Sequence, residues 1–344
     1  MIAEDQERRI RTICLFILAA VAVACSLYFL AKVLVPFVLA LFIAIALTPL
    51  IDLQVRRLRM PRALAVVSSL LLGMIVLGAV GLLVSISVRE LAANSDEYAA
   101  QTRKLVEWAV ERLPVAPADL GADPNAPGYG LVTVPAERIR GLIVDTSSAI
   151  MSLVSDGMLV VIFVCFLLFG GSTRPSPPKG TWGEIVQDMR KYLLTKVLIS
   201  FATGALTGGV LWILGIRLAM VFGLMAFLLN FIPSIGSIVA TLLPLPVVLL
   251  TPWVSAAQAI GAILLPGVVQ FVLGNVLEPR MMGKSFNLHP VTILLTLIFW
   301  GMLWGIVGMF LATPLTAVIK TLFTRHPYTA PLARVLAGRV VPDD

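Results

Sequence analysis

A proline between two opposite charges is the feature of this sequence best suited to bind an ion or a polar solute. Glu278 and Arg280 lie on either side of Pro279, in a strongly apolar half of the chain. Because proline breaks a helix and lacks an N–H, carbonyl groups become available beside a carboxylate and a guanidinium. Two interpretations stay open: the group serves a solute, with Glu278 coupling transport to a proton or cation, or the charges end a helix at the cytoplasmic membrane surface.

A second break lies upstream, where Asn230 precedes a proline and a glycine. Helix ends at such a break can point at a ligand, and a plain turn between helices is the alternative. A charged side chain at membrane depth needs a partner or a function, because its insertion at the centre of a spanning helix costs roughly 2.5–3.5 kcal/mol. We expect Lys196, however, to reach water at the cytoplasmic face. The candidates for a solute or ion pathway are Asn230, Pro233, Ser234, Gly236, Gln270, Asn275, Glu278, Pro279, Arg280 and His289.

Several enzyme chemistries are excluded by the residues that the sequence lacks. It has two histidines, His289 and His326, and no HExxH motif, which excludes a histidine-rich metal centre. The segment Met282–Ser285 contains the GKS of a phosphate loop, but the glycine that opens such a loop, five residues before Gly283, is missing. The three cysteines lie in apolar stretches and form no CxxC motif. We therefore expect no catalytic residue, no metal, no cofactor and no ATP site.

The composition predicts that these residues are positioned by helices in a lipid bilayer. Hydrophobic residues make up 59% of the chain, mean hydropathy is +0.97 and 13% of residues are charged, against about 25% in soluble domains. The net charge of +7 does not indicate nucleic acid, because the arginines flank apolar segments and no basic-aromatic pattern accompanies them. Whole segments of roughly 20 residues, the length of a spanning helix, lack a polar face. The chain is predicted to be an all-α integral membrane protein.

Apolar segments predict about eight transmembrane helices. The clear spans are residues 13–31, 33–51, 63–88, 147–170 and 193–215, followed by shorter or irregular runs at 218–232, 235–250, 254–277 and 291–322. Prolines beside these later runs predict broken or re-entrant helices in the C-terminal half, which are tolerated where protein or a cavity satisfies the backbone. The last run is too long for one straight span. We expect either a bend at Gly301, Gly305 or Gly308, or a re-entrant helix among the shorter runs.

Lysine and arginine positions predict the orientation, because these residues concentrate on the cytoplasmic side. Arginines precede the first span and follow the second, whereas only Lys32 separates the two. Both termini are therefore predicted to be cytoplasmic. The predicted regions are an N-terminal transmembrane region of three helices at 1–88, an extracytoplasmic helical insert at 89–146, a C-terminal transmembrane transport region at 147–322 and a cytoplasmic tail at 323–344. The insert is either a solvated cap or oligomer contact, or part of solute capture.

Motifs between about residues 190 and 322 carry a family resemblance. They are Leu214-Gly215, Gly223, Ala226–Gly236, Gln270, Gly274–Ser285, Leu288–Pro290 and Gly305–Leu315. In these motifs the chain resembles the autoinducer-2 exporter family of bacterial permeases. The first half agrees with this family in its layout of three spans followed by an extracytoplasmic insert.

This resemblance implies a bacterial inner-membrane secondary transporter with about eight spans. Some family members export autoinducer-2, a quorum-sensing molecule, others are credited with sodium- or lithium-proton antiport, and homo-oligomers such as pentamers are expected. Many members carry an aromatic residue in place of Ser234 and a proline in place of Ser237, so the solute stays open. We expect export of an autoinducer-2-like molecule or a related small polar solute. Cation-proton antiport is the alternative, and a non-transporting membrane scaffold or regulator is a third.

Overall fold

The described part of the protein consists of helices and the turns that connect them. The computed structural model describes residues 2–93, 157–170, 180–249, 251, 254–282, 288–325 and 329–338. Five helices there are long and apolar enough to cross a membrane: Ala31–Arg57, Arg62–Leu83, Trp182–Ile213, Ala256–Met281 and Pro290–Thr324. Shorter apolar helices are Ile17–Phe29, Gly157–Gly170, Ala219–Leu229 and Ile235–Leu249. The all-α membrane class is confirmed for these residues, and the number of crossings stays a prediction.

The predicted insert at 89–146 lies outside the described residues beyond Ala93. That residue ends α3 (Arg62–Ala93), which continues a few residues past the boundary expected at residue 88. Within the predicted tail, α13 (Ala330–Leu336) is a short helix that packs against α12. The division of the chain into an insert and a tail therefore stays a prediction.

The chain forms two compact units, of which the first contains residues 1–59, 156–193 and 284–344. Its described helices are α1 (Ile2–Phe29), α2 (Ala31–Arg57), Gly157–Gly170, the beginning of α6 (Thr181–Ile213), α12 (Pro290–Thr324) and α13. α12 packs against both α1 and α2, and the Trp304 indole N–H donates to the carbonyl of Leu27 at 3.1 Å. Arg190 pairs with Asp52 at 3.1 Å, although both side chains are partly exposed and such a pair contributes little stability.

α12 is a helical hairpin that turns at Gly305. This glycine has φ 63° and ψ −145°, a conformation that residues with a Cβ adopt only with strain. The Trp300 indole N–H reaches the Thr316 hydroxyl at 3.4 Å, although residues sixteen apart on a straight helix are separated by roughly 24 Å. The predicted bend is confirmed at one of the three glycines proposed for it. A segment long enough for one crossing therefore folds back on itself.

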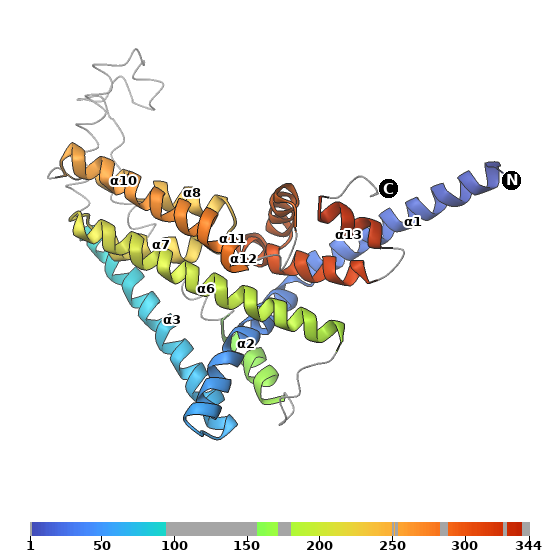
Figure 1. Ribbon diagram of the computed structural model, residues 1–344, viewed down its shortest axis with the longest axis horizontal. Helices are drawn as coiled ribbons and strands as arrows, with labels where there is room; N and C mark the ends of the chain where they lie inside the picture. Colours follow the sequence, from blue (N-terminus) through green and yellow to red (C-terminus); the bar gives the residue numbers. More distant parts are fainter. Residues whose placement is uncertain are drawn as a thin grey trace, which may run out of the picture. The chain divides into compact units, whose positions relative to one another are not determined.

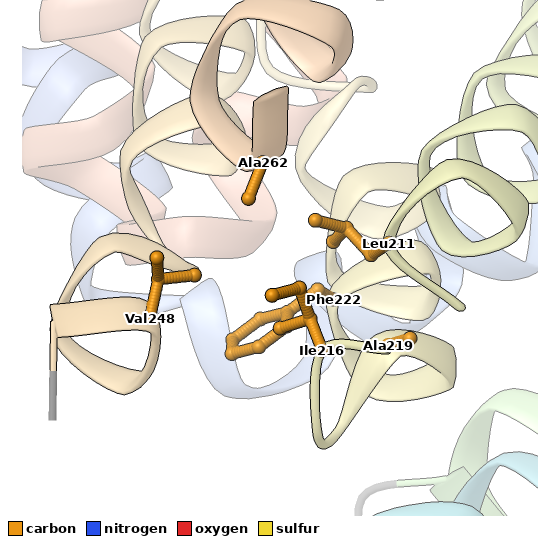
Figure 2. Close-up of a cluster of buried hydrophobic side chains, with 6 residues drawn as sticks. All are labelled: Leu211, Ile216, Ala219, Phe222, Val248 and Ala262. Atoms are coloured by element: carbon orange, nitrogen blue, oxygen red, sulfur yellow. The ribbon is translucent and has the colours of Figure 1, made fainter. Parts of the chain in front are cut away.

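The second unit contains residues 60–155 and 194–283, and it holds most of the candidate residues. Besides α3 and the rest of α6, its described helices are α7 (Ala219–Leu229), α8 (Ile235–Leu242), α9 (Leu245–Leu249), α10 (Ala256–Phe271), the π-helix η2 (Val272–Leu277) and α11 (Glu278–Met282). α10 lies along α8 (Figure 1). The core of this unit joins α6, α7, α9 and α10 through Leu211, Ile216, Ala219, Phe222, Val248 and Ala262 (Figure 2).

The start of α10 is fixed by polar contacts. Ser255 and Gln258 form a capping box, which satisfies amide groups that the first turn leaves without partners. The Gln258 amide also donates to the carbonyl of Leu214 at 3.1 Å. Gln258 is thus a polar residue of an apolar segment whose role is to hold α10 on the core.

Glycines let α6 and α7 approach closely. A Cβ on Gly223 would lie 2.7 Å from the carbonyl oxygen of Gly204 and 2.9 Å from the Cα of Gly208. Small residues allow such backbone contact between membrane helices, where van der Waals packing replaces the hydrophobic effect. The crossing therefore depends on the absence of a side chain at Gly223.

We predict that Gly223→Ala lowers the free energy of unfolding by about 1–3 kcal/mol, because the added methyl group forces two backbones apart. The measurement is the thermal unfolding midpoint of purified protein in detergent. Gly209→Ala is the matched control, since a Cβ there meets nothing within 4 Å. Equal midpoints for both variants would contradict the prediction.

Candidate functional site

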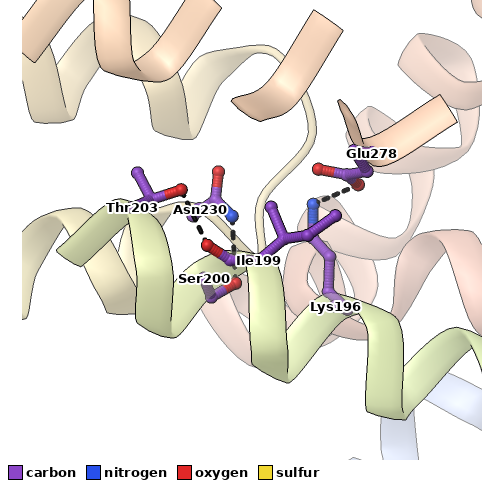
Figure 3. A network of polar contacts seen from close by, with 6 residues as sticks. All are labelled: Lys196, Ile199, Ser200, Thr203, Asn230 and Glu278. Carbon is purple, nitrogen blue, oxygen red and sulfur yellow. Dashed lines mark hydrogen bonds and ion pairs between the residues drawn. The ribbon is translucent and has the colours of Figure 1, made fainter. Parts of the chain in front are cut away.

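Lys196 on α6 and Glu278 at the start of α11 form a largely buried ion pair (Figure 3). Lys196 Nζ lies 2.6 Å from Glu278 Oε1, and the side chains are 5% and 17% exposed. Both residues belong to the second unit. The expectation that Lys196 reaches water is therefore wrong: the side chain points inward, where Glu278 neutralises it.

A π-helix places Glu278 at this position. The Glu278 N–H donates to the carbonyl of Leu273, five residues earlier, which is the wide turn of a π-helix. The next residue, Pro279, has no N–H, and in an α-helix its ring would clash with the carbonyl of Asn275. A wider turn before the proline relieves that clash. The predicted disruption at Pro279 thus takes the form of a π-helix followed by one more helical turn.

Asn230 makes the second polar contact to α6. Its amide nitrogen donates to the Ser200 hydroxyl at 3.0 Å, and both residues are buried (Figure 3). The predicted break is present, because α7 ends at Leu229 and α8 begins at Ile235. In between, Ser234 has φ 60°, a left-handed conformation that is uncommon for residues other than glycine. The break turns the amide inward onto α6.

The polar residues of α6 share one face. Lys196, Ser200, Thr203 and Thr207 follow one another at intervals of four, three and four residues, the spacing of one helical face. All four are buried. Thr203 donates to the carbonyl of Ile199 at 2.8 Å, while the Thr207 hydroxyl has no hydrogen-bond partner among the described residues. This spacing was the sequence signal that could have added Lys196 and Ser200 to the candidates.

Gln270 and Asn275 line an open groove of about 300 Å³ between α8 and the α10–η2 segment. Gln270 is 4% exposed, and neither its amide nitrogen nor its amide oxygen has a hydrogen-bond partner in the described part of the chain. Buried amides without partners are rare because they cost free energy. The groove therefore differs from the two contacts with α6, because here a buried amide has no hydrogen-bond partner among the described residues.

Comparison with known proteins decides the family. A model of the AI-2E family of transporters matches residues 16–327. The chain belongs to this family. Among its relatives, the AI-2 transport protein TqsA of Escherichia coli K12 is 34% identical over 313 residues, which cover 87% of this chain and 88% of TqsA.

Two further relatives are provisionally named as transport proteins. YhhT of Escherichia coli K12 is 30% identical over 314 residues, 87% of this chain and 86% of YhhT. A Haemophilus influenzae Rd protein is 30% identical over 346 residues, 93% of this chain and 94% of that protein. Together with the apolar helices, family membership identifies a multi-pass bacterial membrane protein of a transporter family.

Four further candidates of this AI-2E chain take no part in the ion pair. Arg280, Pro279 and Ser234 are exposed, and no ion pair of Arg280 occurs within the described ranges. His289 belongs to the first unit, where its Nδ1 accepts the N–H of Val291 at 3.3 Å and caps α12. His289 is thus the N-cap residue of α12, and its place on a solute pathway stays a prediction.

Pro233 and Gly236 shape the break that holds Asn230. Pro233 is half-buried and Gly236 is buried, and the Gly236 N–H donates to the carbonyl of Ile232 at 3.1 Å.

Because Lys196 and Ser200 are one turn apart on α6, their partners Glu278 and Asn230 approach the same helix face. Two distant breaks of the chain thus meet one polar stripe, an arrangement that can pass a proton, a cation or a polar solute between fixed groups.

Proposed function

We propose that this chain is a bacterial inner-membrane secondary exporter of a small polar solute, an autoinducer-2-like molecule or a related compound, and that the Lys196–Glu278 pair lies on its path. The burial of this pair, at 5% and 17% exposure, carries the proposal. Desolvation of two charges offsets most of their attraction, so well-packed apolar residues would stabilise the fold equally well. A charge pair in a transporter's apolar unit is therefore better explained by transport than by stability.

The pair and the family together favour a coupled mechanism. The ion pair between Glu278 and Lys196 breaks when Glu278 binds a proton or a cation. The side chains of Lys196, Asn230 and Ser200 then become available to bind a solute. Transport names among the relatives support solute movement, and the name of TqsA credits that protein with AI-2. Cytoplasmic termini, as the lysine and arginine positions indicate, and a homo-oligomeric assembly belong to the same proposal.

The test compares small metabolites in medium and cells of a bacterium with and without the full-length chain. We predict that at least one small polar metabolite, with autoinducer-2 measured among them, shifts from cells to medium when the chain is produced. A pH-sensitive dye in inverted vesicles is read in parallel after addition of sodium or lithium. No shifted metabolite would contradict the proposal, and a sodium- or lithium-dependent dye signal without such a shift would replace it with cation-proton antiport.

A further inference from the structure

Arginines gather where α2 ends. Arg56 and Arg57 lie in its last turn, and Arg59 follows two residues later. All three side chains are exposed and belong to the first unit. Residues 56–59, the basic turn, lead from α2 toward α3, and both helices contain a segment long and apolar enough to cross a membrane. A turn between two such segments lies at the depth of the lipid headgroups.

The chain supplies no local carboxylate for these charges. Asp and Glu are absent from residues 53–89, and Asp52, just before that interval, pairs with Arg190. No ion pair of the three arginines occurs in the described part of the chain. A guanidinium binds phosphates as well as carboxylates, through a planar fork of N–H donors. The basic turn is therefore open to an external anion.

The backbone of Arg59 distinguishes this turn from an ordinary helix end. Cations near a helix C-terminus are favourable, and arginines mark the cytoplasmic side of a membrane, which accounts for Arg56 and Arg57. Arg59, however, has φ 52° in the position after the C-cap residue Leu58, where glycine is usual. This conformation is strained for a residue with a Cβ. An arginine kept where glycine is free of strain indicates a function for its side chain.

Apolar side chains beside the arginines favour a lipid over a soluble anion. Leu53 and Leu58 are exposed, and Leu53 shares a face of α2 with Arg57, four residues later. A free phosphate makes no favourable contact with leucine. A phospholipid, in contrast, presents acyl chains and a charged phosphodiester next to each other at the membrane surface.

We infer that the basic turn is a binding site for an anionic phospholipid. Its phosphodiester is held by Arg56, Arg57 and Arg59, and its acyl chains lie along Leu53 and Leu58. This site goes beyond the proposed function and does not depend on it, because lipid binding requires no exported solute.

The experiment is native mass spectrometry of the full chain in an uncharged detergent, with phosphatidylglycerol or phosphatidylcholine added. Both lipids have a phosphodiester, but the choline group adds a cation that the arginines repel. We expect phosphatidylglycerol to bind at least about tenfold more tightly than phosphatidylcholine. Equal affinity for the two lipids would overturn the inference.

Arg59→Gly separates lipid binding from folding. Glycine adopts the φ of 52° without strain, so the thermal unfolding midpoint is expected to equal or exceed that of wild type. The same variant is expected to bind phosphatidylglycerol about fivefold more weakly, because one charge near the membrane surface is lost. Wild-type affinity in Arg59→Gly protein contradicts the inference.

Two further variants control for total charge and for folding. Lys32→Gln removes one positive charge from the opposite end of α2, where Lys32 is exposed, and it is expected to bind phosphatidylglycerol as wild type. Arg57→Gln changes an exposed residue and is expected to weaken binding about fivefold, which tests the site if Arg59→Gly protein is not recovered. A loss in Lys32→Gln protein as large as in the arginine variants shows an effect of total charge and overturns the site.

Soluble glycerol 3-phosphate distinguishes a lipid from a free phosphate ester. Added in large excess, it is expected to leave phosphatidylglycerol bound, because it lacks the acyl chains that contact the leucines. Displacement of the lipid assigns the basic turn to a soluble anion and overturns the inference of a lipid site.

Discussion

Replacing Lys196 with methionine is expected to lower the free energy of unfolding by about 3–5 kcal/mol, the range for removing one partner of a buried ion pair. Methionine fills a similar volume, so the loss comes from charge rather than from packing. It leaves the Glu278 carboxylate, which is 17% exposed, without its cation. The measurement is chemical or thermal unfolding of the purified protein, followed by tryptophan fluorescence.

A double-mutant cycle assigns that effect to the pair. Lys196→Met combined with Glu278→Gln removes both charges and is expected to recover most of the lost stability, because no uncompensated charge remains. Lys191→Met is the matched control, since Lys191 is an exposed lysine on the same helix. A double variant as unstable as the sum of both single variants would show that the side chains do not interact.

The second large effect is expected at Gly236. A Cβ there would lie 1.7 Å from the carbonyl oxygen of Leu229 and 2.6 Å from its carbon. Both atoms are backbone, so Gly236→Ala must open the turn between α7 and α8. Overpacking costs typically 1–3 kcal/mol, and a clash with backbone on this scale is expected to exceed about 3 kcal/mol.

Loss of this turn also removes a functional contact. Asn230 lies within this turn, so its hydrogen bond to Ser200 on α6 is expected to break. The packing of α7 against α6 is expected to be lost with it. We predict that Gly236→Ala protein is recovered in low yield, and that the recovered fraction exports no solute. Gly261→Ala is the control, because a Cβ there makes ordinary contact with Leu214 at 3.5 Å. Normal yield and export from Gly236→Ala would refute this account of the break.

The helix breaks could be predicted from sequence because their causes are local. Proline and glycine restrict the backbone wherever they occur, so the break after Asn230 and the bend of α12 at Gly305 follow from residue type and segment length. The form of the break at Pro279 could not be predicted in the same way. A proline can end a helix or widen it, and neighbouring helices decide between these outcomes.

The partner of Glu278 was missed for a different physical reason. A lysine near the end of a span can extend to water or turn inward, and only a carboxylate 82 residues away makes the inward position favourable. Arg280 illustrates the opposite case, because it lies two residues from Glu278 yet is exposed. The sequence signal for the partner of Glu278 was the helical spacing of Lys196, Ser200 and Thr203, which share one buried face of α6.

The most direct test of the proposed role of the ion pair is solute efflux from proteoliposomes that contain equal amounts of folded wild-type protein or Lys196→Met/Glu278→Gln protein. The solute is the metabolite that the wild-type chain moves from cells to medium. We predict that the double variant unfolds at nearly the wild-type midpoint and yet shows no efflux above empty liposomes. Efflux at the wild-type rate would contradict the account, because the buried charges would then serve the fold and not transport.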